Sequence, residues 1–98
     1  MSGWILRGAN GGAAITFRLR PGSVRTIGRA ARADFIVDAA LVSRLHCRLT
    51  ATRDGVEVED LRSTNGTFVN GARVTRATLA PGDVLGIGRV RLTLERTG

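Results

Sequence analysis

Apolar and polar residues alternate with a period of two at several places in the chain, whereas the 3.6-residue period of a helix hardly occurs. Every second residue is apolar, and those between are polar or charged, in the segments 15–20, 46–51, 56–59 and 90–95. This alternation is typical of strands that bury one face against a core. The pattern therefore predicts a chain built from β-strands.

Turn-forming pairs separate these segments at short intervals: Asn10-Gly11, Pro21-Gly22, Asp54-Gly55, Asn65-Gly66, Asn70-Gly71 and Pro81-Gly82. Asp54-Gly55 and Asn70-Gly71 are the strongest hairpin signals, because a type I′ turn needs positive φ at both central residues. The one helix-friendly segment, residues 30–33, is too short to form a helix alone. About ten short strands with frequent turns predict an all-β fold, and we expect an antiparallel β-sandwich.

A chain of 98 residues with 43% hydrophobic content predicts one globular domain, residues 1–98. No apolar run approaches the roughly 18 residues of a membrane span, and residues 1–7 lack the features of a signal peptide. A single cysteine, Cys47, and a single histidine, His46, exclude an internal disulfide and a four-ligand zinc site of Cys and His. We expect a cytoplasmic domain without a metal or cofactor, in which Cys47 is a small buried hydrophobe.

The formal net charge is +7, and all of the cationic residues are arginine. Such a balance favours an anionic partner, and the pI of about 11.7 makes nucleic acid one candidate. The arginines are spread along the whole chain, however, and base stacking on a β fold usually needs exposed aromatic residues beside a basic stripe. The chain has only four aromatic residues: Trp4, Phe17, Phe35 and Phe68. Nucleic-acid binding is therefore the alternative function.

The densest polar constellation lies in three segments that are expected to be loops: Gly28-Arg29, residues 43–46 and residues 62–67. Loops gather at the two ends of a sandwich, so these segments can meet at one rim. They contain arginines, hydroxyl side chains and an asparagine amide. Such a set of donors suits the binding of a tetrahedral dianion.

A catalytic triad of Ser43, His46 and Asp60 is conceivable from residue types alone. The chain has no G-x-S-x-G sequence, no Walker A sequence and no acidic cluster for magnesium. We therefore expect no enzymatic activity.

Three motifs in the same order resemble the signature of forkhead-associated (FHA) domains: Gly28-Arg29, Ser43-Arg44-Leu45-His46-Cys47, and the segment 60–71 with its Ser63-Thr64-Asn65-Gly66-Thr67. Leu79, Gly82-Asp83 and Ile87-Gly88 fit the same pattern, and the resemblance covers about residues 22–94. It implies a sandwich of about eleven strands whose loops at one end bind phosphothreonine in a partner protein. The domain would then be a signalling adaptor downstream of a Ser/Thr protein kinase.

The resemblance also implies roles for single residues. The family's phosphate contacts fall on Arg29, Ser43, Arg44 and Thr64, and Asn65 matches the asparagine that bonds the ligand backbone. His46 matches a histidine that supports the serine loop. Gly28, Gly66 and Asn70 are expected to support the site through the architecture.

A short internal repeat links residues 21–29 to residues 81–89, and Arg29 and Arg89 both follow the pattern Val-x-x-Ile-Gly. Both arginines are expected to leave a strand end, although the sequence does not say whether at the same rim. The resemblance implies that the third residue after the phosphothreonine is read near Leu41 and the Gly88-Arg89 turn. Leu41 favours an aliphatic ligand residue and Arg89 an acidic one; we expect the aliphatic preference, because burial of an aliphatic side chain contributes about 1.5–3 kcal/mol and an exposed ion pair about 0–1.

Overall fold

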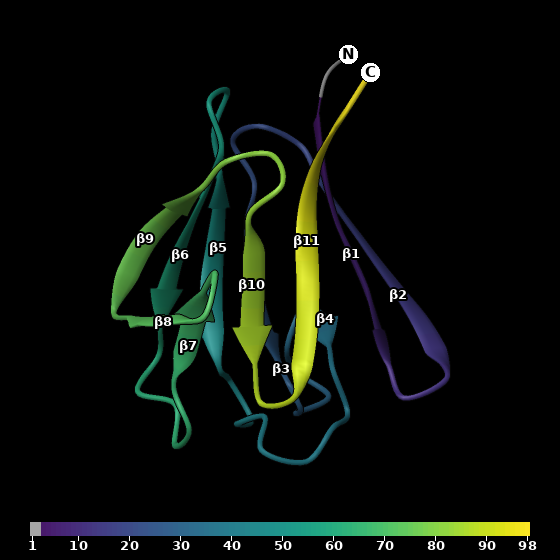
Figure 1. The fold of residues 1–98 in the computed structure, drawn as a ribbon, viewed down its shortest axis with the longest axis vertical. Coiled ribbons are helices and arrows are strands. Elements are labelled where there is room, and N and C mark those ends of the chain that lie inside the picture. The colour runs from purple at the N-terminus through teal and green to yellow at the C-terminus, as the bar shows by residue number, and fades with distance from the viewer. Residues whose placement is uncertain (1–2) are drawn as a thin grey trace.

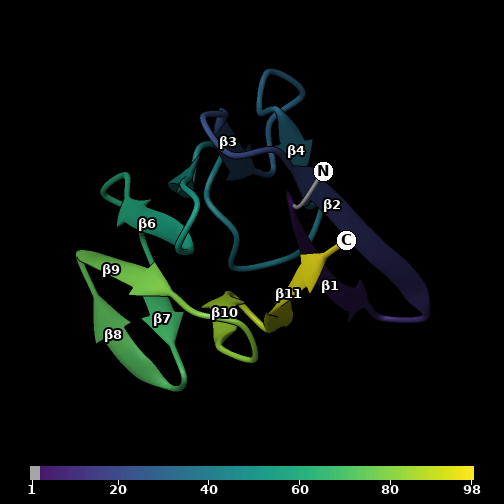
Figure 2. The ribbon, with the colours of Figure 1, turned by 90° about the horizontal axis from the view of Figure 1, so that it is seen from above.

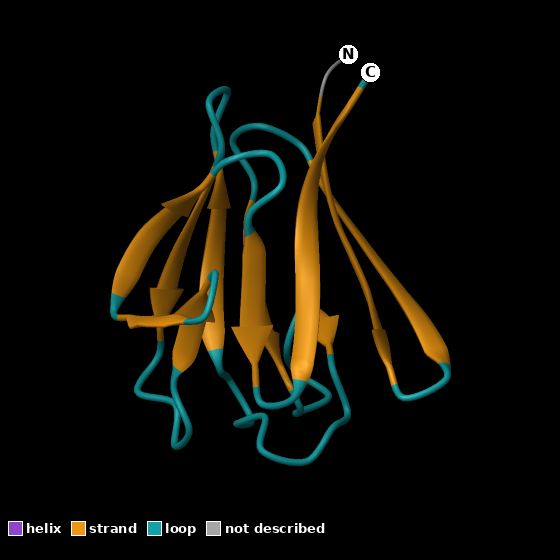
Figure 3. Cartoon of the chain, in the orientation of Figure 1, coloured by secondary structure: helices purple, strands orange, loops and turns teal. Residues whose placement is uncertain are grey.

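The computed structural model describes residues 3–98, which form eleven strands and no helix. None of these residues therefore belongs to a helix that could cross a membrane. The strands are β1 (Gly3–Asn10), β2 (Ala13–Leu19), β3 (Val24–Gly28), β4 (Phe35–Ile36), β5 (Cys47–Ala51), β6 (Val56–Asp60), β7 (Thr67–Val69), β8 (Ala72–Val74), β9 (Arg76–Leu79), β10 (Val84–Ile87) and β11 (Val90–Thr97). The loops gather at the two ends of the strands (Figure 3).

The strands form two sheets, one with the order β2-β1-β11-β10-β7-β8 and one with the order β4-β3-β5-β6-β9. Figure 2 shows the two layers from above. The predicted β-sandwich is confirmed, with one departure from antiparallel pairing: β4 runs parallel to β3. The backbone N–H and the hydroxyl of Thr26 both donate to the carboxylate of Asp34, and this contact holds the intervening loop along β3. After this loop the chain forms the two-residue strand β4, which runs beside β3 in the same direction.

The alternating segments bury the faces that the sequence predicts. Cys47, Leu49 and Ala51 of β5 are fully or almost fully buried, as are Leu92 and Leu94 of β11. Each buried aliphatic side chain of this size contributes about 1.5–3 kcal/mol. Burial also raises the pKa of the Cys47 thiol, so this residue behaves as a core hydrophobe, as predicted.

The two predicted hairpins form, but only one has the predicted turn. Asn70 and Gly71 have φ values of 50° and 84°, which confirms the type I′ turn between β7 and β8. The type I′ prediction for Asp54-Gly55 is wrong, because neither residue is among those with positive φ. The Thr52 hydroxyl accepts the N–H groups of both residues at 3.2 Å and makes a four-residue loop.

The two ends of the sandwich differ. Figure 1 shows both chain termini at one end, together with the β2–β3 and β5–β6 loops. The opposite end carries the loop after β3, the long loop between β4 and β5, the β6–β7 loop and the β10–β11 turn. The three expected site segments therefore meet at one rim.

Candidate functional site

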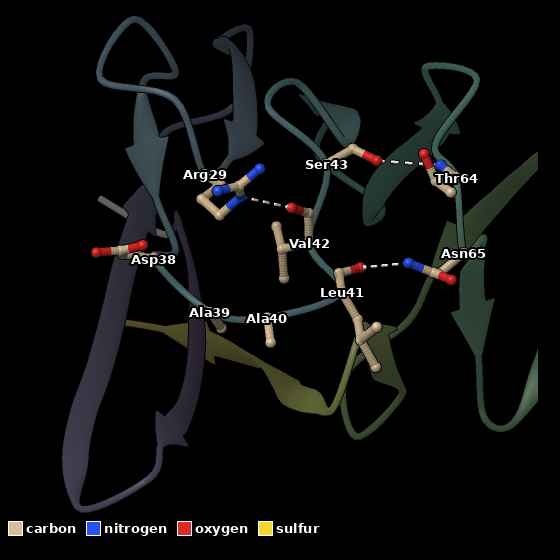
Figure 4. A pocket seen from close by; sticks show the side chains of 9 residues that line it. All are labelled: Arg29, Asp38, Ala39, Ala40, Leu41, Val42, Ser43, Thr64 and Asn65. Atoms are coloured by element: carbon tan, nitrogen blue, oxygen red, sulfur yellow. Dashed lines mark hydrogen bonds between the residues drawn. The ribbon is translucent and has the colours of Figure 1, made fainter.

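A pocket of about 400 Å³ opens among the loops at the end opposite the termini (Figure 4). It is lined by Arg29, Asp38, Ala39, Ala40, Leu41, Val42, Ser43, Thr64 and Asn65. Five of the residues that the sequence singled out therefore lie together: Arg29, Leu41, Ser43, Thr64 and Asn65.

The backbone before the pocket fixes the position of Arg29. A Cβ atom on Gly28 would lie 2.1 Å from the carbonyl oxygen of Arg44, so only glycine fits where the two chain segments cross. The N–H of Arg29 donates to the Ser43 carbonyl at 2.9 Å, and its Nε donates to the Val42 carbonyl at 3.1 Å. Both terminal nitrogens of the guanidinium remain available, and Arg29 forms no ion pair with any residue of the range 3–98.

Ser43 and Thr64 connect the two loops that face Arg29. The backbone N–H of Thr64 donates to the Ser43 hydroxyl oxygen at 3.0 Å, so the hydroxyl hydrogen of Ser43 is free to donate into the pocket. Asn65 makes a second link between the same loops, through its Nδ2 and the Leu41 carbonyl at 3.2 Å. Figure 4 shows both links and the Arg29–Val42 bond at the pocket wall.

His46 is fully buried beneath this pair of loops. Its Nδ1 accepts the N–H of Ser43 at 3.0 Å, and its Nε2 lies 2.8 Å from the Gly66 carbonyl oxygen. These partners require a neutral ring with the hydrogen on Nε2, since a hydrogen on Nδ1 would face the hydrogen of Ser43 N–H. His46 thus joins the Ser43 loop to the loop that carries Asn65.

Asp60 holds the β6–β7 loop, which carries Thr64 and Asn65, through side-chain hydrogen bonds. Its carboxylate accepts hydrogen bonds from the hydroxyl and the N–H of Ser63 and from the hydroxyl of Thr67, the last at 2.7 Å. Burial opposes ionisation of Asp60, but the hydrogen bonds from Ser63 and Thr67 outweigh it and hold the pKa of its carboxyl below the ordinary value. Since Asp60 bonds Ser63 and Thr67, and His46 bonds backbone groups, the two do not form a catalytic triad with Ser43.

Gly66 allows the Asn65 loop to turn. Its φ is +94°, and a Cβ atom there would lie 2.7 Å from Nε of Arg73. The Gly66 N–H donates to the Ser63 hydroxyl at 3.0 Å. The positive φ favours glycine at this position, whereas the flexible Arg73 side chain could move aside.

Leu41 combines two unusual properties at the rim. It has a φ of 70°, which is costly for a residue with a Cβ, and its side chain is 46% exposed although it is a leucine. The β10–β11 turn lies beside it, since a Cβ on Gly88 would be 3.2 Å from the Leu41 carbonyl carbon. Arg29 and Arg89 therefore leave strand ends at the same rim.

Six of the singled-out residues do not line the pocket: Gly28, Arg44, His46, Gly66, Asn70 and Arg89. Arg44 is exposed and does not line it; its carbonyl accepts the N–H of Ala30 at 3.1 Å. The Asn70 side chain bonds the Asp83 carboxylate at 3.0 Å and the Val84 N–H at 2.9 Å, so it fastens the β7–β8 turn to the start of β10. Asn70 is architectural, but its contacts are away from the pocket.

Sequence reasoning missed four lining residues: Asp38, Ala39, Ala40 and Val42. They precede Ser43 in the same loop, and only this proximity could have indicated them. Asp38 is the notable one because it is an acidic residue in the lining of a pocket otherwise suited to anions. Figure 4 shows its carboxylate at the edge of the pocket, on the side away from Ser43 and Thr64 and pointing outward.

The comparison with known proteins gives one family. Residues 25–88 match the FHA domain model. The chain is 51% identical over 78 residues to the ABC transporter ATP-binding/permease protein Rv1747 of Mycobacterium tuberculosis. The aligned segment covers 80% of this chain and 9% of Rv1747. It is also 35% identical over 88 residues to the glycogen accumulation regulator GarA of the same species. This aligned segment covers 90% of this chain and 52% of GarA.

A structural relative leads to the same family. It was solved for the structural and functional analysis of phosphothreonine-dependent FHA domain interactions, and it is 34% identical, with a TM-score of 0.85 and coverage of 95% of both chains. The curated relatives above are longer than this chain, which spans 9% of Rv1747 and 52% of GarA. On the family match over residues 25–88 and the shared sandwich, the chain belongs to the FHA domain family.

Proposed function

We propose that this domain binds phosphothreonine-containing segments of partner proteins and acts as an adaptor. The observation that carries the proposal is the convergence of Arg29 and Ser43 on one pocket, with the terminal guanidinium nitrogens and the hydroxyl hydrogen uncommitted. Arginine clusters of this kind are used to recognise phosphorylated motifs. A related structure was solved for phosphothreonine-dependent FHA domain interactions, which supports the same ligand here.

Each residue of the pocket then has a role. Arg29 donates two hydrogen bonds to the phosphate oxygens, and the Ser43 hydroxyl donates a third. Thr64 adds its hydroxyl, and the Asn65 amide holds the ligand backbone next to the phosphothreonine. Arg44 contributes longer-range attraction, because its side chain is exposed outside the pocket.

The ligand preference follows from the apolar parts of the rim. A threonine γ-methyl in a small recess near Ser43 and Asn65 would favour phosphothreonine over phosphoserine by about 0.8 kcal/mol, the value of one buried methyl group. The third residue after the phosphothreonine meets Leu41, whose exposed side chain gains from an aliphatic neighbour. Arg89 beside it adds general attraction.

Binding is the whole activity in this proposal. His46 and Asp60 support loops and are engaged with other partners, so they are not available to activate Ser43. A Ser/Thr protein kinase would phosphorylate the threonine that the domain binds.

Nucleic-acid binding is less well supported. Among residues 3–98, Trp4 is 1% exposed, Phe68 is half-buried, and Phe17 and Phe35 stack on each other with ring centroids 4.4 Å apart. These aromatic rings do not form an exposed platform for bases.

An oriented phosphothreonine peptide library tests the proposal and the ligand preference together. We expect enrichment of aliphatic residues at the third position after the phosphothreonine. No selection of phosphorylated over unphosphorylated pools would contradict the proposed function. Enrichment of Asp or Glu at that position, lost in R89A, would contradict the role given to Leu41.

A further inference from the structure

A second basic depression lies at the other end of the sandwich, beside the chain termini. It has a volume of about 1020 Å³, compared with about 400 Å³ for the pocket of Arg29 and Ser43, the proposed phosphothreonine pocket. Four arginines from three parts of the chain line it: Arg18 of β2, Arg20 and Arg25 on either side of the β2–β3 turn, and Arg53 of the β5–β6 loop. Figure 1 shows these two loops on the side of the molecule where N and C lie.

None of the four guanidinium groups forms an ion pair within residues 3–98, although the charge of Arg25 acts on the nearby Asp34 carboxylate. The ion pairs formed within residues 3–98 are Arg7–Glu95, Arg48–Glu59 and Arg76–Glu59, and none of them involves the depression. All four arginines are exposed. Arg25 is in register with the buried Leu49, and its Nη1 donates to the Val24 carbonyl at 2.9 Å. Such a cluster repels itself, and an anionic ligand would relieve that repulsion.

A fifth arginine is fixed next to the same mouth. The Arg96 guanidinium carbon lies 4.3 Å from the centre of the Trp4 ring, and its Nη2 donates to the Arg53 carbonyl at 3.4 Å. The Trp4 indole N–H in turn donates to the Thr52 carbonyl at 2.8 Å. These contacts hold the β5–β6 loop, and with it Arg53, against the wall of the depression.

We infer that this depression binds an acidic, Asp- and Glu-rich segment of a partner polypeptide, independently of the phosphothreonine pocket. Its volume and the spread of its arginines fit an extended segment with several carboxylates better than one small anion. Arginine forks bind carboxylates in two-point contacts. The aromatic residue in the lining, Trp4, is 1% exposed and cannot stack on bases, which favours a peptide over a nucleic acid.

The test measures binding of a fluorescent, unphosphorylated peptide of Glu and Asp residues to the whole chain by anisotropy at low salt. We expect R20E and R53E each to weaken binding about three- to tenfold, since each removes an attraction and adds a repulsion. The matched control is R91E, because Arg91 is exposed on β11 outside both pockets and the substitution changes the net charge equally. R91E should leave the affinity nearly unchanged.

Two further measurements separate the alternatives. Binding of a phosphothreonine peptide should survive R20E and R53E, and R29A should leave the acidic peptide bound. The inference is overturned if R91E weakens the acidic peptide as much as R20E does, or if R29A releases it. It is also overturned if a single-stranded oligothymidylate of the same charge binds more tightly than the peptide and is weakened by the same substitutions.

Discussion

The side chain of Ser43 and the backbone of Thr64, which are 21 residues apart, are joined by a hydrogen bond in which the Thr64 N–H donates to the Ser43 hydroxyl oxygen at 3.0 Å. The bond uses the hydroxyl as an acceptor and leaves its hydrogen for the ligand. It also couples the position of the ligand-facing hydroxyl to the loop that carries Asn65. Under the proposed function, the Ser43 side chain therefore both shapes the site and contacts the ligand.

The substitution S43A tests that double role. It removes a donor to a charged group, which contributes about 1.5–3 kcal/mol, so phosphopeptide affinity should fall at least tenfold. Calorimetric titration measures the change, with S23A as the control, because Ser23 lies in the β2–β3 turn at the opposite end and bonds the Arg20 carbonyl. Unchanged affinity in a folded S43A protein would remove Ser43 from the site.

Arg29 should be the strongest single contributor to binding. R29A removes a two-point contact with the phosphate and should cost at least tenfold in affinity. R29K keeps the charge but loses the planar fork and should fall between the wild type and R29A. R91A is the matched control, since Arg91 is an exposed arginine outside the pocket. Equal binding by R29A and R91A in the same titration would refute the assignment.

The pH dependence of binding should follow the ligand. The second pKa of a phosphate monoester is about 6, whereas arginine stays charged across this range. The dianion accepts stronger hydrogen bonds from Arg29 and Ser43 than the monoanion does, so phosphopeptide affinity should decrease as the pH falls through about 6. Titrations at a series of pH values, repeated with a phosphonate analogue of different pKa, check this. A midpoint that does not move with the pKa of the ligand would point to a protein group instead.

Asp38 is expected to weaken binding of the phosphate. Asp38 lies at the edge of the pocket, and two unit charges about 4 Å apart interact by about 1 kcal/mol in water. D38N should therefore increase phosphopeptide affinity about two- to fivefold, an amount consistent with that repulsion. A weaker complex for D38N, with a ligand that carries no basic residue, would show that Asp38 contacts the peptide favourably.

Asp60 makes the stability of the domain sensitive to acid. Because hydrogen bonds from Ser63 and Thr67 hold its pKa below the ordinary value, its contribution is complete above about pH 4 and is lost as the pH falls through the lower folded-state pKa. D60N should lower the free energy of unfolding by about 1–3 kcal/mol at neutral pH, since it disturbs this partly buried network. Denaturant unfolding of both proteins should then show the difference shrinking at acid pH. A difference that is constant from neutral to acid pH would contradict the ionised state of Asp60.

The sandwich could be predicted because its core strands follow a local rule. Alternation of apolar residues in β5 and β11 directly identifies the buried face, and Asn70-Gly71 specifies a type I′ turn through backbone sterics alone. The Asp54-Gly55 turn could not be predicted in the same way. There the hydroxyl of Thr52 competes for the backbone N–H groups, and its reach depends on where β5 ends.

Only those residues of the candidate site that stand in sequence motifs could be predicted. Arg29, Ser43, Thr64 and Asn65 stand in recognisable patterns and do line one pocket. Asp38 and Val42 have no such signal, because they enter the pocket through the path of a long loop that hydrogen bonds to Asn10 and Arg29 hold in place. The basic depression at the other end depends on residues from three elements, and only the folded chain brings Arg20 and Arg53 together.

Phosphothreonine recognition is tested by a pair of calorimetric titrations of the wild-type domain with one peptide, once with its threonine phosphorylated and once without. We expect micromolar affinity for the phosphorylated form, roughly −8 kcal/mol, and no measurable binding of the unphosphorylated form. Equal affinity for the two forms would contradict phosphothreonine recognition at the pocket of Arg29 and Ser43.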